Sequence, residues 1–463
     1  MVTMGDFRDT LYTIDKTGRR KWVYPHYAPG RYFRTRTVVA YLLLAIYLSL
    51  PWITISGTQG ILLDIPHRRF IFFGAEFWAT DTIFLFLVLA GLGMSLFFFT
   101  SVFGRIWCGW ACPETVFLEF LFRPIERLIE GSDSARRKLD RAPWTFEKIR
   151  KKFLKHGFCA AASWVIASTA LAYFIGREPL LEMMSDYPWR NPGPFFMTLV
   201  LMGVMAFQFG WFREQFCTIL CPYARFQSVL MDEQSLLVGY DKERGEPRGK
   251  VRARETTPTG DCVDCGLCVR VCPTGIDIRN GTQLECIACT ACIDACDSIM
   301  DGLGRPRGLI RYDSESGLAG EKRSTLRPRV FVYGAILGVL AAVFIYKINH
   351  RSPIEIEIMR ASTSRFVVET ESGHVINQFS LRLANRSSSA RHFEAKIKGE
   401  SAAEIVTPLK HLELHPGENL KVPLFIKAPQ SLFIEGKAEV EAEILDSTGF
   451  AFSRSLSLFG PEN

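Results

Sequence analysis

The last third of the chain contains no cysteine, and this absence limits how that region can be stabilised. All thirteen cysteines of the 463-residue chain lie before residue 297. A disulfide framework is therefore excluded after that point. The N-terminal region also lacks the features of a cleavable signal peptide, because it is polar and charged as far as Arg36 and no A-x-A site follows the first apolar run. We therefore expect no cleaved leader.

Long apolar runs, by contrast, are abundant in a chain that is 48% hydrophobic and contains 36 Phe. Five of them are long enough to span a bilayer or nearly so: Val38–Ile55, Ile83–Phe103, Phe158–Ile175, Phe195–Trp211 and Val330–Tyr346. Their central stretches carry neither charge nor a polar face, which favours lipid-facing helices over buried core helices. A chain of this length is also too long for one core. We predict a multi-domain membrane protein whose α-helical bundle has five transmembrane spans.

Basic residues are distributed unevenly among the loops between these runs. They are numerous from Arg8 to Arg36 and again between the second and third runs, whereas few basic residues occupy the first–second and third–fourth loops. The positive-inside rule places the basic segments in the cytoplasm. We therefore expect the N-terminus and the segment after the fourth run to be cytoplasmic, and residues from about 350 to be periplasmic. The basic loop around Arg136 is expected to contact lipid head groups rather than nucleic acid.

Eight cysteines lie in two runs, CVDCGLCVRVCP and CIACTACIDAC. Each run reads Cys-x2-Cys-x2-Cys-x3-Cys, the spacing of bacterial two-cluster ferredoxins, in which the fourth Cys of a run binds the other cluster. The spacing predicts two [4Fe-4S] ligand sets: Cys262, Cys265, Cys268 and Cys296 for the first cluster, and Cys272, Cys286, Cys289 and Cys292 for the second. Structural zinc sites pair Cys-x2-Cys units across a longer gap, so this spacing fits zinc poorly.

A second cysteine pattern occurs twice, in FGRIWCGWACPETVFLEFL from Phe103 and in FREQFCTILCPYARFQSVL from Phe212. Each copy contains Cys-x3-Cys-Pro, and we expect the two cysteines of a copy to lie on one face of a helix at the cytoplasmic membrane edge. If the copies pack together, four thiols converge. Such thiolates could hold a soft ion such as Cu(I) or another iron–sulfur cluster; alternatively, the cysteines are small packing residues. The candidate copper site consists of Cys108, Cys112, Cys217 and Cys221.

The region after the fifth run alternates apolar and polar residues in about seven short segments, among them IEIEI, FSLRLANRS, LKVPLFIKAP and SRSLSLF. This number of short strands in roughly 110 residues is typical of an Ig-like sandwich. Its residue types support no catalytic site, so we interpret it as a solubilising or docking module.

These patterns together predict the domain organisation. The domains are a cytoplasmic N-terminal segment (1–37), a four-span membrane domain with the repeated Cys-x3-Cys-Pro (38–230), a cytoplasmic two-cluster ferredoxin-like domain (231–325), a fifth transmembrane helix (328–348) and a periplasmic Ig-like β domain (352–463).

The two Cys-x3-Cys-Pro copies, the eight-cysteine segment and the β-rich tail resemble the CcoG/FixG/RdxA family of cytochrome c oxidase accessory proteins over essentially the whole length. The resemblance implies a polyferredoxin-like protein of the bacterial inner membrane with two [4Fe-4S] clusters and a periplasmic Ig-like domain. It also implies a role in building cbb3-type oxidase. The expected activity is that of a cupric reductase. Its expected partners are copper ions, oxidase assembly components and an unidentified cytoplasmic electron donor.

Two other functions stay open at this stage. The chain could be a generic electron-transfer subunit that passes electrons to quinone or to a periplasmic reductase, or a non-catalytic assembly scaffold with structural clusters. No residue is assigned a catalytic role, because transfer of an electron to a metal ion requires no general acid or base. We also expect contact with the lipid bilayer and no nucleic-acid partner. Homodimer formation stays open.

Overall fold

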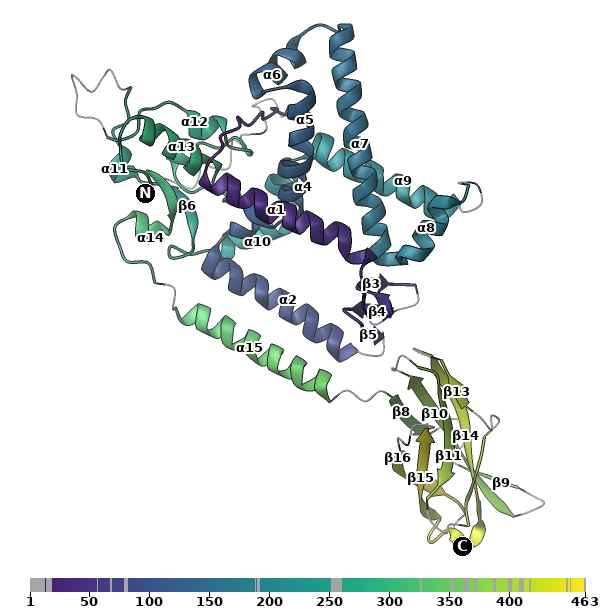
Figure 1. The fold of residues 1–463 in the computed structure, drawn as a ribbon. Coiled ribbons are helices and arrows are strands. Elements are labelled where there is room, and N and C mark those ends of the chain that lie inside the picture. The colour runs from purple at the N-terminus through teal and green to yellow at the C-terminus, as the bar shows by residue number, and fades with distance from the viewer. Residues whose placement is uncertain are drawn as a thin grey trace. The chain divides into compact units, whose positions relative to one another are not determined.

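The computed structural model describes residues 13, 19–55, 57–66, 69–78, 82–187, 189, 192–250, 260–324, 327–350, 354–360, 366–369, 373–385, 389–398, 402–407, 412–415, 418–446, 449 and 451–461. The chain forms two units, which are described separately below. One comprises residues 1–62 and 83–343, and the other comprises residues 63–82 and 344–463. Figure 1 shows the helices and strands with the labels used here.

Five helices in the described part of the chain are long and apolar enough to cross a membrane, which confirms the predicted number of spans. They cover Arg31–Trp52, Ile83–Phe103, Phe146–Ile175, Phe195–Phe212 and Pro328–Asn349. The first and third begin well before the apolar runs that predicted them. Their extra turns are rich in Lys and Arg, whose long side chains allow a helix to continue beyond the apolar region. Hydropathy therefore located the spans but not their full helical length.

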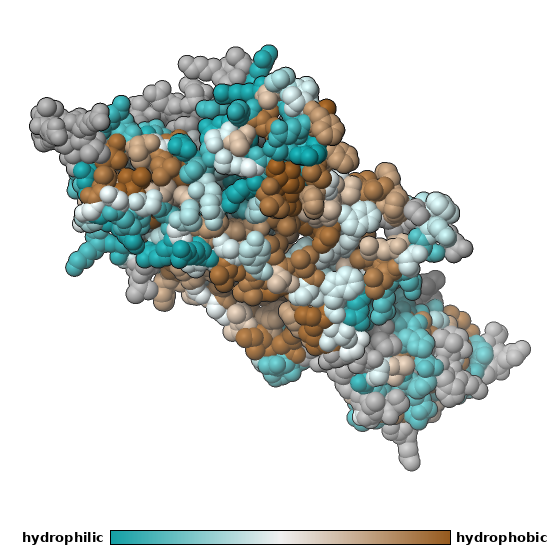
Figure 2. Space-filling model, turned by 45° about the horizontal axis from the view of Figure 1, so that its top comes forward, coloured by the Kyte–Doolittle hydropathy of each residue, from teal (hydrophilic) through white to brown (hydrophobic). Residues whose placement is uncertain are grey.

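The outward surface of these helices is apolar. Leu85, Phe86 and Leu89 of α2 (Thr82–Phe103) and Phe331 and Val339 of α15 (Pro328–Asn349) are between 55% and 76% exposed. Figure 2 shows extensive hydrophobic surface over the helical part of the molecule. Such large apolar patches are rare on proteins that are surrounded by water. A lipid bilayer covers them without exposing backbone groups, because helices satisfy their own hydrogen bonds.

Besides α2, the described helices of the first unit include three that carry spans: α1 (Arg31–Ser49), α7 (Phe146–Ile175) and α9 (Pro192–Phe207). The shorter helices are α3 (Ile106–Trp110), α4 (Pro113–Phe117), α5 (Arg123–Glu130), α6 (Asp133–Arg141), α8 (Arg177–Ser185), α10 (Pro222–Leu230), α11 (Lys242–Gly245), α12 (Leu267–Arg270), α13 (Ala291–Gly302) and α14 (Glu315–Leu318). Short 3-10 turns cover Leu50–Trp52 and Ile278–Asn280, and π-helical turns cover Leu118–Phe122, Gln208–Phe212 and Phe216–Leu220. The strands of this unit are β1 (Thr54–Ile55), β2 (Thr58–Gln59), β6 (Leu237–Tyr240) and β7 (Ile310–Asp313), with β1–β2 and β6–β7 pairing antiparallel. The boundary between the two units falls within β3 (Ile61–Asp64).

The membrane helices share a small core that is rich in aromatic side chains. Phe117, Phe122 and Phe209 are buried there together with residues of α1 and α7. The rings of Phe122 and Phe209 stack with their centroids 4.8 Å apart. Cys159 of α7 is buried in the same cluster, as a small packing residue would be.

The ferredoxin-like segment attaches to the beginning of the first span. The carboxylate of Asp294 on α13 accepts hydrogen bonds from the backbone N–H groups of Tyr32 (3.1 Å) and Phe33 (2.7 Å). These N–H groups belong to the first turn of α1, where they have no partner within the helix and where negative charge is favourable. Figure 1 shows α12 and α13 gathered at this end of α1.

The second unit contains an Ig-like sandwich, which confirms the predicted fold class. One sheet has the order β12–β14–β10–β8, with β9 pairing to β10, and the other has the order β13–β11–β15–β16. The strands are β8 (Ile354–Arg360), β9 (Val367–Val368), β10 (His374–Asn385), β11 (Arg391–Ile397), β12 (Glu404–Val406), β13 (Leu412–Leu414), β14 (Asn419–Pro429), β15 (Lys437–Asp446) and β16 (Ala451–Phe459). The unit also contains β4 (Arg69–Phe72) and β5 (Ala75–Trp78), which pair antiparallel.

Alternation explains how these strands build the core of the sandwich. Along β15 the side chains alternate between exposed or half-buried and buried positions, and Val440 and Ile444 point inward. Asn377 of β10 is fully buried and joins the two sheets, because its amide donates to the carbonyl oxygen of Phe459 (2.9 Å) and its side-chain oxygen accepts from the Phe459 N–H (2.8 Å). The sequence missed β12 and β13, since three residues are too few for alternation to be recognised.

Candidate metal centres

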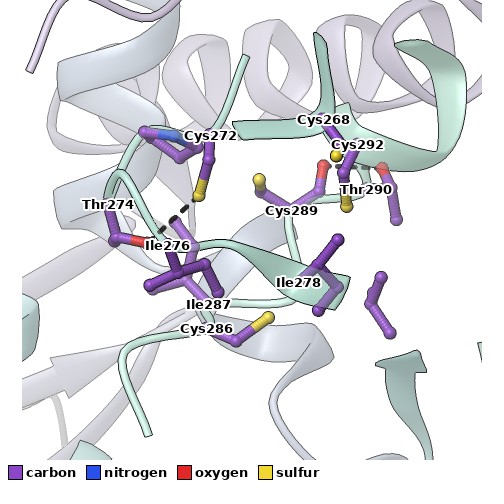
Figure 3. A pocket seen from close by; sticks show the side chains of 12 residues that line it. Cys268, Cys272, Thr274, Ile276, Ile278, Cys286, Ile287, Cys289, Thr290 and Cys292 are labelled. Carbon is purple, nitrogen blue, oxygen red and sulfur yellow. Dashed lines mark hydrogen bonds between the residues drawn. The ribbon is translucent and has the colours of Figure 1, made fainter. Parts of the chain in front are cut away.

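The eight ferredoxin cysteines surround two neighbouring pockets, and each pocket gathers one of the predicted ligand sets. The first is lined by Cys262, Cys265, Cys268 and Cys296, and the second by Cys272, Cys286, Cys289 and Cys292. Figure 3 shows the sulfur atoms of the second set around the pocket. The two cavities have equal volumes of about 20 Å³ each. Because Cys268 lines both pockets, the two centres adjoin.

The two cysteine runs repeat the same backbone geometry. Asp264 and Gly266 in the first run have φ of 48° and 66°, and Ala288 and Thr290 at the corresponding places of the second have φ of 52° and 63°. Such left-handed residues turn the chain sharply, so that successive cysteines face one centre. Thr290 adopts this conformation although β-branched residues rarely do. Its hydroxyl donates to the carbonyl oxygen of Cys289 at 2.6 Å. Sequence spacing gave no sign of this strained position.

Burial affects the protonation of the more enclosed of these thiols. It raises the pKa of Cys286 and of Cys296 to about 12 and that of Cys268 to about 11. A thiol of this kind stays neutral near pH 7 unless a bound metal stabilises the thiolate. The ligand sets are therefore matched to a positively charged metal centre rather than to a reactive free cysteine.

The donor chemistry distinguishes a cluster from a single ion. Four thiolates at each pocket are the ligands of a [4Fe-4S] cluster. Among the described residues, no group of three or more His, Cys, Asp or Glu side chains is gathered as a single metal ion would require. Four sulfurs bound tetrahedrally at about 2.3 Å to one zinc lie only about 4 Å apart, whereas a cluster separates its ligands onto different irons. The four cysteines at each pocket, with the spacing of two-cluster ferredoxins, fit a [4Fe-4S] cluster.

Hydrogen bonds to sulfur complete the second pocket. The hydroxyl of Thr274 lies 3.3 Å from the Cys272 sulfur, and backbone N–H groups of Thr274, Gly275 and Ile276 also reach that sulfur. Pro273 has no N–H, so the chain turns here and directs the following amides at the ligand. Such bonds stabilise the negative charge of a thiolate-bound cluster and adjust its reduction potential.

The second cysteine pattern is also a structural repeat, although its local structure differs from the prediction. Cys112 and Cys221 do not continue the helix of Cys108 and Cys217. Each is extended and precedes the proline that begins α4 or α10. The prediction that each pair lies on one helix face is therefore wrong. The physical reason is the proline, whose ring disfavours helical backbone in the residue before it.

Matching hydrogen bonds and backbone angles show how closely the two copies agree. The N–H of Cys112 donates to the carbonyl oxygen of Trp107 at 2.9 Å, and the N–H of Cys221 donates to that of Phe216 at 2.8 Å. Both copies are preceded by a residue with positive φ, Gly104 at 56° and Arg213 at 54°. The non-glycine residue at the second position is strained. It is held by a buried ion pair with Glu126, with 2.9 Å between Arg213 Nη2 and Glu126 Oε2.

The four thiols of the two copies converge. Burial raises the pKa of Cys217, and the nearby charges of Glu114 and of the other three cysteines raise it further. Burial likewise raises the pKa of Cys108 to about 12, with contributions from Cys112 and Cys221. The Cys108 sulfur lies 3.2 Å from the side-chain oxygen of Gln227, which is fully buried. We call Cys108, Cys112, Cys217 and Cys221 the four-cysteine site.

The four-cysteine site lies directly against the loop of the second ferredoxin pocket. A Cβ atom on Gly109 would lie only 2.8 Å from the Cα of Cys289 and 2.7 Å from the carbonyl oxygen of Ile287. The buried guanidinium of Arg36 joins the same segments, because it donates to the carbonyl oxygens of Gly109 (2.9 Å) and Cys289 (2.7 Å). Arg105 bonds to the carbonyl oxygens of Cys286 (3.3 Å) and Ala224 (2.7 Å).

One basic residue has a different environment from the one expected. Arg136 is 6% exposed, and its guanidinium lies 2.5 Å from Glu126 and 3.6 Å from Glu130. It therefore belongs to a buried ion-pair network with Arg213 and does not face lipid head groups. The number of basic residues in each loop predicts the topology, but it does not show which arginines form ion pairs.

Three family profiles match the chain in agreement with this geometry. Residues 212–315 match a "4Fe-4S dicluster domain", residues 82–131 match a "4Fe-4S binding domain", and residues 344–461 match the "IG-like fold at C-terminal of FixG". Five membrane helices together with cluster-binding ferredoxin elements define the class: this is a multi-pass membrane protein that transfers electrons through iron–sulfur clusters.

Relatives extend over most of the chain. Nitrogen fixation protein FixG of Rhizobium meliloti (strain 1021) is 36% identical over 426 residues, which are 83% of this chain and 80% of that protein. Proteins RdxA and RdxB of Cereibacter sphaeroides are 37% and 36% identical and cover 82% and 92% of this chain, and the same shares of their own lengths. The chain belongs to the FixG/RdxA family.

Proposed function

We propose that this protein carries electrons from a cytoplasmic donor to Cu(II) and thereby supplies Cu(I) for the assembly of cbb3-type cytochrome c oxidase. The observation that carries the proposal is the direct packing of the four-cysteine site against the loop that holds Cys289. The iron–sulfur clusters, when bound, supply single electrons and require no proton donor. Cu(II) is the substrate, and the four-cysteine site, first predicted as a copper site, is where it receives its electron.

The chemistry of the site supports reduction over simple transport. Sulfur prefers Cu(I) to Cu(II), so contact with a sulfur-rich site makes cupric ion easier to reduce. The buried side chains of Arg36 and Arg105 fix the distance between this site and the ferredoxin segment, because both bond to backbone carbonyls on either side. With the proposed orientation, the N-terminus, the ferredoxin segment and the four-cysteine site lie on the cytoplasmic side, and the Ig-like domain lies in the periplasm.

The direct test uses the purified full-length protein under anaerobic conditions. The clusters are reduced, excess reductant is removed, and Cu(II) is added together with a Cu(I)-specific chelator. We expect one Cu(I) for each electron that the clusters lose, and no oxidation when redox-inert Zn(II) replaces Cu(II). Clusters that ignore Cu(II) but reduce a quinone analogue would show a generic electron carrier. Clusters inert to both would show an assembly scaffold.

A cellular prediction follows for the four-cysteine site. Replacing Cys108 and Cys112 together by Ser should lower cbb3 oxidase activity in cells grown at limiting copper, because fewer Cu(I) ions are delivered. Added copper should partly restore the activity, since a surplus bypasses one delivery route by mass action. Oxidase activity and protein abundance are measured in parallel, with Cys159→Ser as the matched control. Oxidase activity equal to that of the parent at limiting copper would contradict the proposal.

A further inference from the structure

We propose that Cys108, Cys112, Cys217 and Cys221 hold a third [4Fe-4S] cluster, so that Cu(II) meets its electron at a cluster rather than at a preformed copper-binding site. The cluster itself is inferred from the protein alone, and only its role toward copper rests on the proposed function. The site joins the two copies of the repeat, and each copy supplies two ligands.

The packing of the two copies is the first argument. The two copies pack against each other, because the Cys108 sulfur lies 3.2 Å from the Gln227 side-chain oxygen and Arg105 donates to the carbonyl oxygen of Ala224 at 2.7 Å. Both copies place a cysteine in extended backbone directly before a proline, Cys112 before Pro113 and Cys221 before Pro222, so each copy offers its ligands in the same way. Four thiolates brought together from two segments match the ligand number of a [4Fe-4S] cluster.

Counting ligands gives an independent argument. The segment 82–131 matches a 4Fe-4S binding domain, yet it contains only Cys108 and Cys112. A [4Fe-4S] cluster held by cysteines takes four, so two must come from elsewhere. Outside the ferredoxin runs, the chain offers only Cys159, Cys217 and Cys221. Cys159 is buried in the aromatic core of the membrane helices, which leaves Cys217 and Cys221.

The surroundings of Cys112 repeat those of a ferredoxin ligand. Cys112 precedes Pro113, and the N–H groups of Glu114 and Thr115 bond to its sulfur. Cys272 likewise precedes a proline, and the N–H groups that follow bond to its sulfur. N–H groups directed at a cysteine sulfur stabilise a thiolate that is bound to a cluster. The side chain of Gln227 in the second copy is fully buried, and its oxygen lies 3.2 Å from the Cys108 sulfur of the first copy.

The location of the site gives this cluster a role. Gly109 follows Cys108 directly and contacts the backbone of Cys289, a ligand of the second ferredoxin pocket. A cluster at the four-cysteine site would therefore lie beside the second ferredoxin cluster. In the reaction, one electron leaves the reduced cluster and one Cu(II) ion becomes Cu(I). No bond to carbon is formed or broken, and no proton moves.

The test counts iron and acid-labile sulfide in the full-length protein, purified anaerobically in detergent and without added copper. We expect about twelve irons and twelve sulfides per chain, against about eight for two clusters. The paired variants Cys108→Ser with Cys112→Ser, and Cys217→Ser with Cys221→Ser, should each lose about four irons and keep both ferredoxin resonance signals. Cys159→Ser is the control and should keep all the iron.

The outcomes separate this inference from the proposed function. About eight irons in the parent protein, with or without bound copper, would overturn the third cluster even if Cu(II) were reduced. Twelve irons retained in both paired variants would also overturn it. If a paired variant fails to fold, the iron content of the parent and of the single variant Cys217→Ser decides the matter. A protein with twelve irons that does not reduce Cu(II) would support the cluster and refute the copper role.

Discussion

At the scale of single residues, the spacing of the cysteines predicts two ferredoxin ligand sets, and in the structure the eight cysteines line two adjoining pockets. Ligand spacing is local, so it is visible in the sequence. The contact of Gly109 with Cys289 joins segments far apart in the chain, and no pattern near either residue indicates it. The positive φ of Thr290 could not be predicted from the sequence either, because β-branched residues are not expected in that conformation.

Thr274 provides a test of how hydrogen bonds adjust the second cluster. Its hydroxyl lies 3.3 Å from the Cys272 sulfur. A hydrogen bond to sulfur stabilises the more negative reduced cluster, so Thr274→Val should lower the reduction potential, on the order of tens of millivolts for a bond worth about 1 kcal/mol. Redox titration followed by electron paramagnetic resonance measures this shift. Ser298→Ala is the control, because that hydroxyl donates to the Ala295 carbonyl oxygen and not to sulfur. An unchanged or raised potential would refute the assignment.

Gly109 tests the contact between the four-cysteine site and the ferredoxin segment. An added Cβ would meet backbone atoms of the Ile287–Cys289 loop, which cannot move aside as a flexible side chain could. We expect Gly109→Ala to destabilise the protein by about 1–3 kcal/mol and to slow the oxidation of the reduced clusters by Cu(II). In the control Gly91→Ala on α2, the new Cβ meets nothing within 4 Å. Thermal unfolding that is identical for both variants would show that the contact is not tight.

At the scale of elements, hydropathy and alternation predicted the five spans and the sandwich because both report burial of whole faces. The same reasoning failed at the four-cysteine site, where an uninterrupted helix was assumed. Pro113 and Pro222 were the available signal, since each forces the preceding cysteine into extended backbone. The π-helical turns near both cysteine pairs had no recognisable signal, because an extra residue in a helical turn does not alter composition.

The attachment of α13 to α1 can be tested at Asp294. Its carboxylate is buried and accepts from two N–H groups at the beginning of α1. Asp294→Ala leaves those donors unsatisfied, so the free energy of unfolding of the ferredoxin segment should fall by about 1–3 kcal/mol. Hydrogen exchange of the amides in the first turn of α1 should become faster. Asp301→Ala on the same helix removes only an exposed pair with Arg307 and should change little. Equal protection in both variants would contradict the cap.

At the scale of the whole molecule, the sequence was informative because the chain is built from modules that each carry a local signature. Cysteine spacing, apolar runs and strand alternation occupy different segments, so no long-range pairing had to be guessed. The sequence did not predict the contacts between the segments. These contacts are the hydrogen bonds of Arg36, the cap formed by Asp294 and the buried ion-pair network around Glu126. Each of these connects residues distant in sequence.

The orientation in the membrane can be measured with reporter fusions. Fusions after Gly320 and after Ser352 flank α15, the fifth helix long enough to span the bilayer. From the distribution of basic residues, we expect the first reporter to be active in the cytoplasm and the second in the periplasm. Immunoblots check that both fusions are present in equal amount. Reporters that are active in the same compartment would mean that α15 does not cross the membrane.

The central claim is that electrons held by the ferredoxin clusters leave through the four-cysteine site to Cu(II). The most direct measurement mixes the reduced protein with Cu(II) in a stopped-flow instrument and follows the return of cluster absorbance in the parent and in the variant with Cys217→Ser and Cys221→Ser. The account predicts rapid oxidation of the parent, with stoichiometric Cu(I), and oxidation of the ferredoxin clusters at least about tenfold slower in the variant, a barrier increase of about 1.4 kcal/mol. Equal rates in the two proteins would contradict it, because copper would then take electrons without the four-cysteine site.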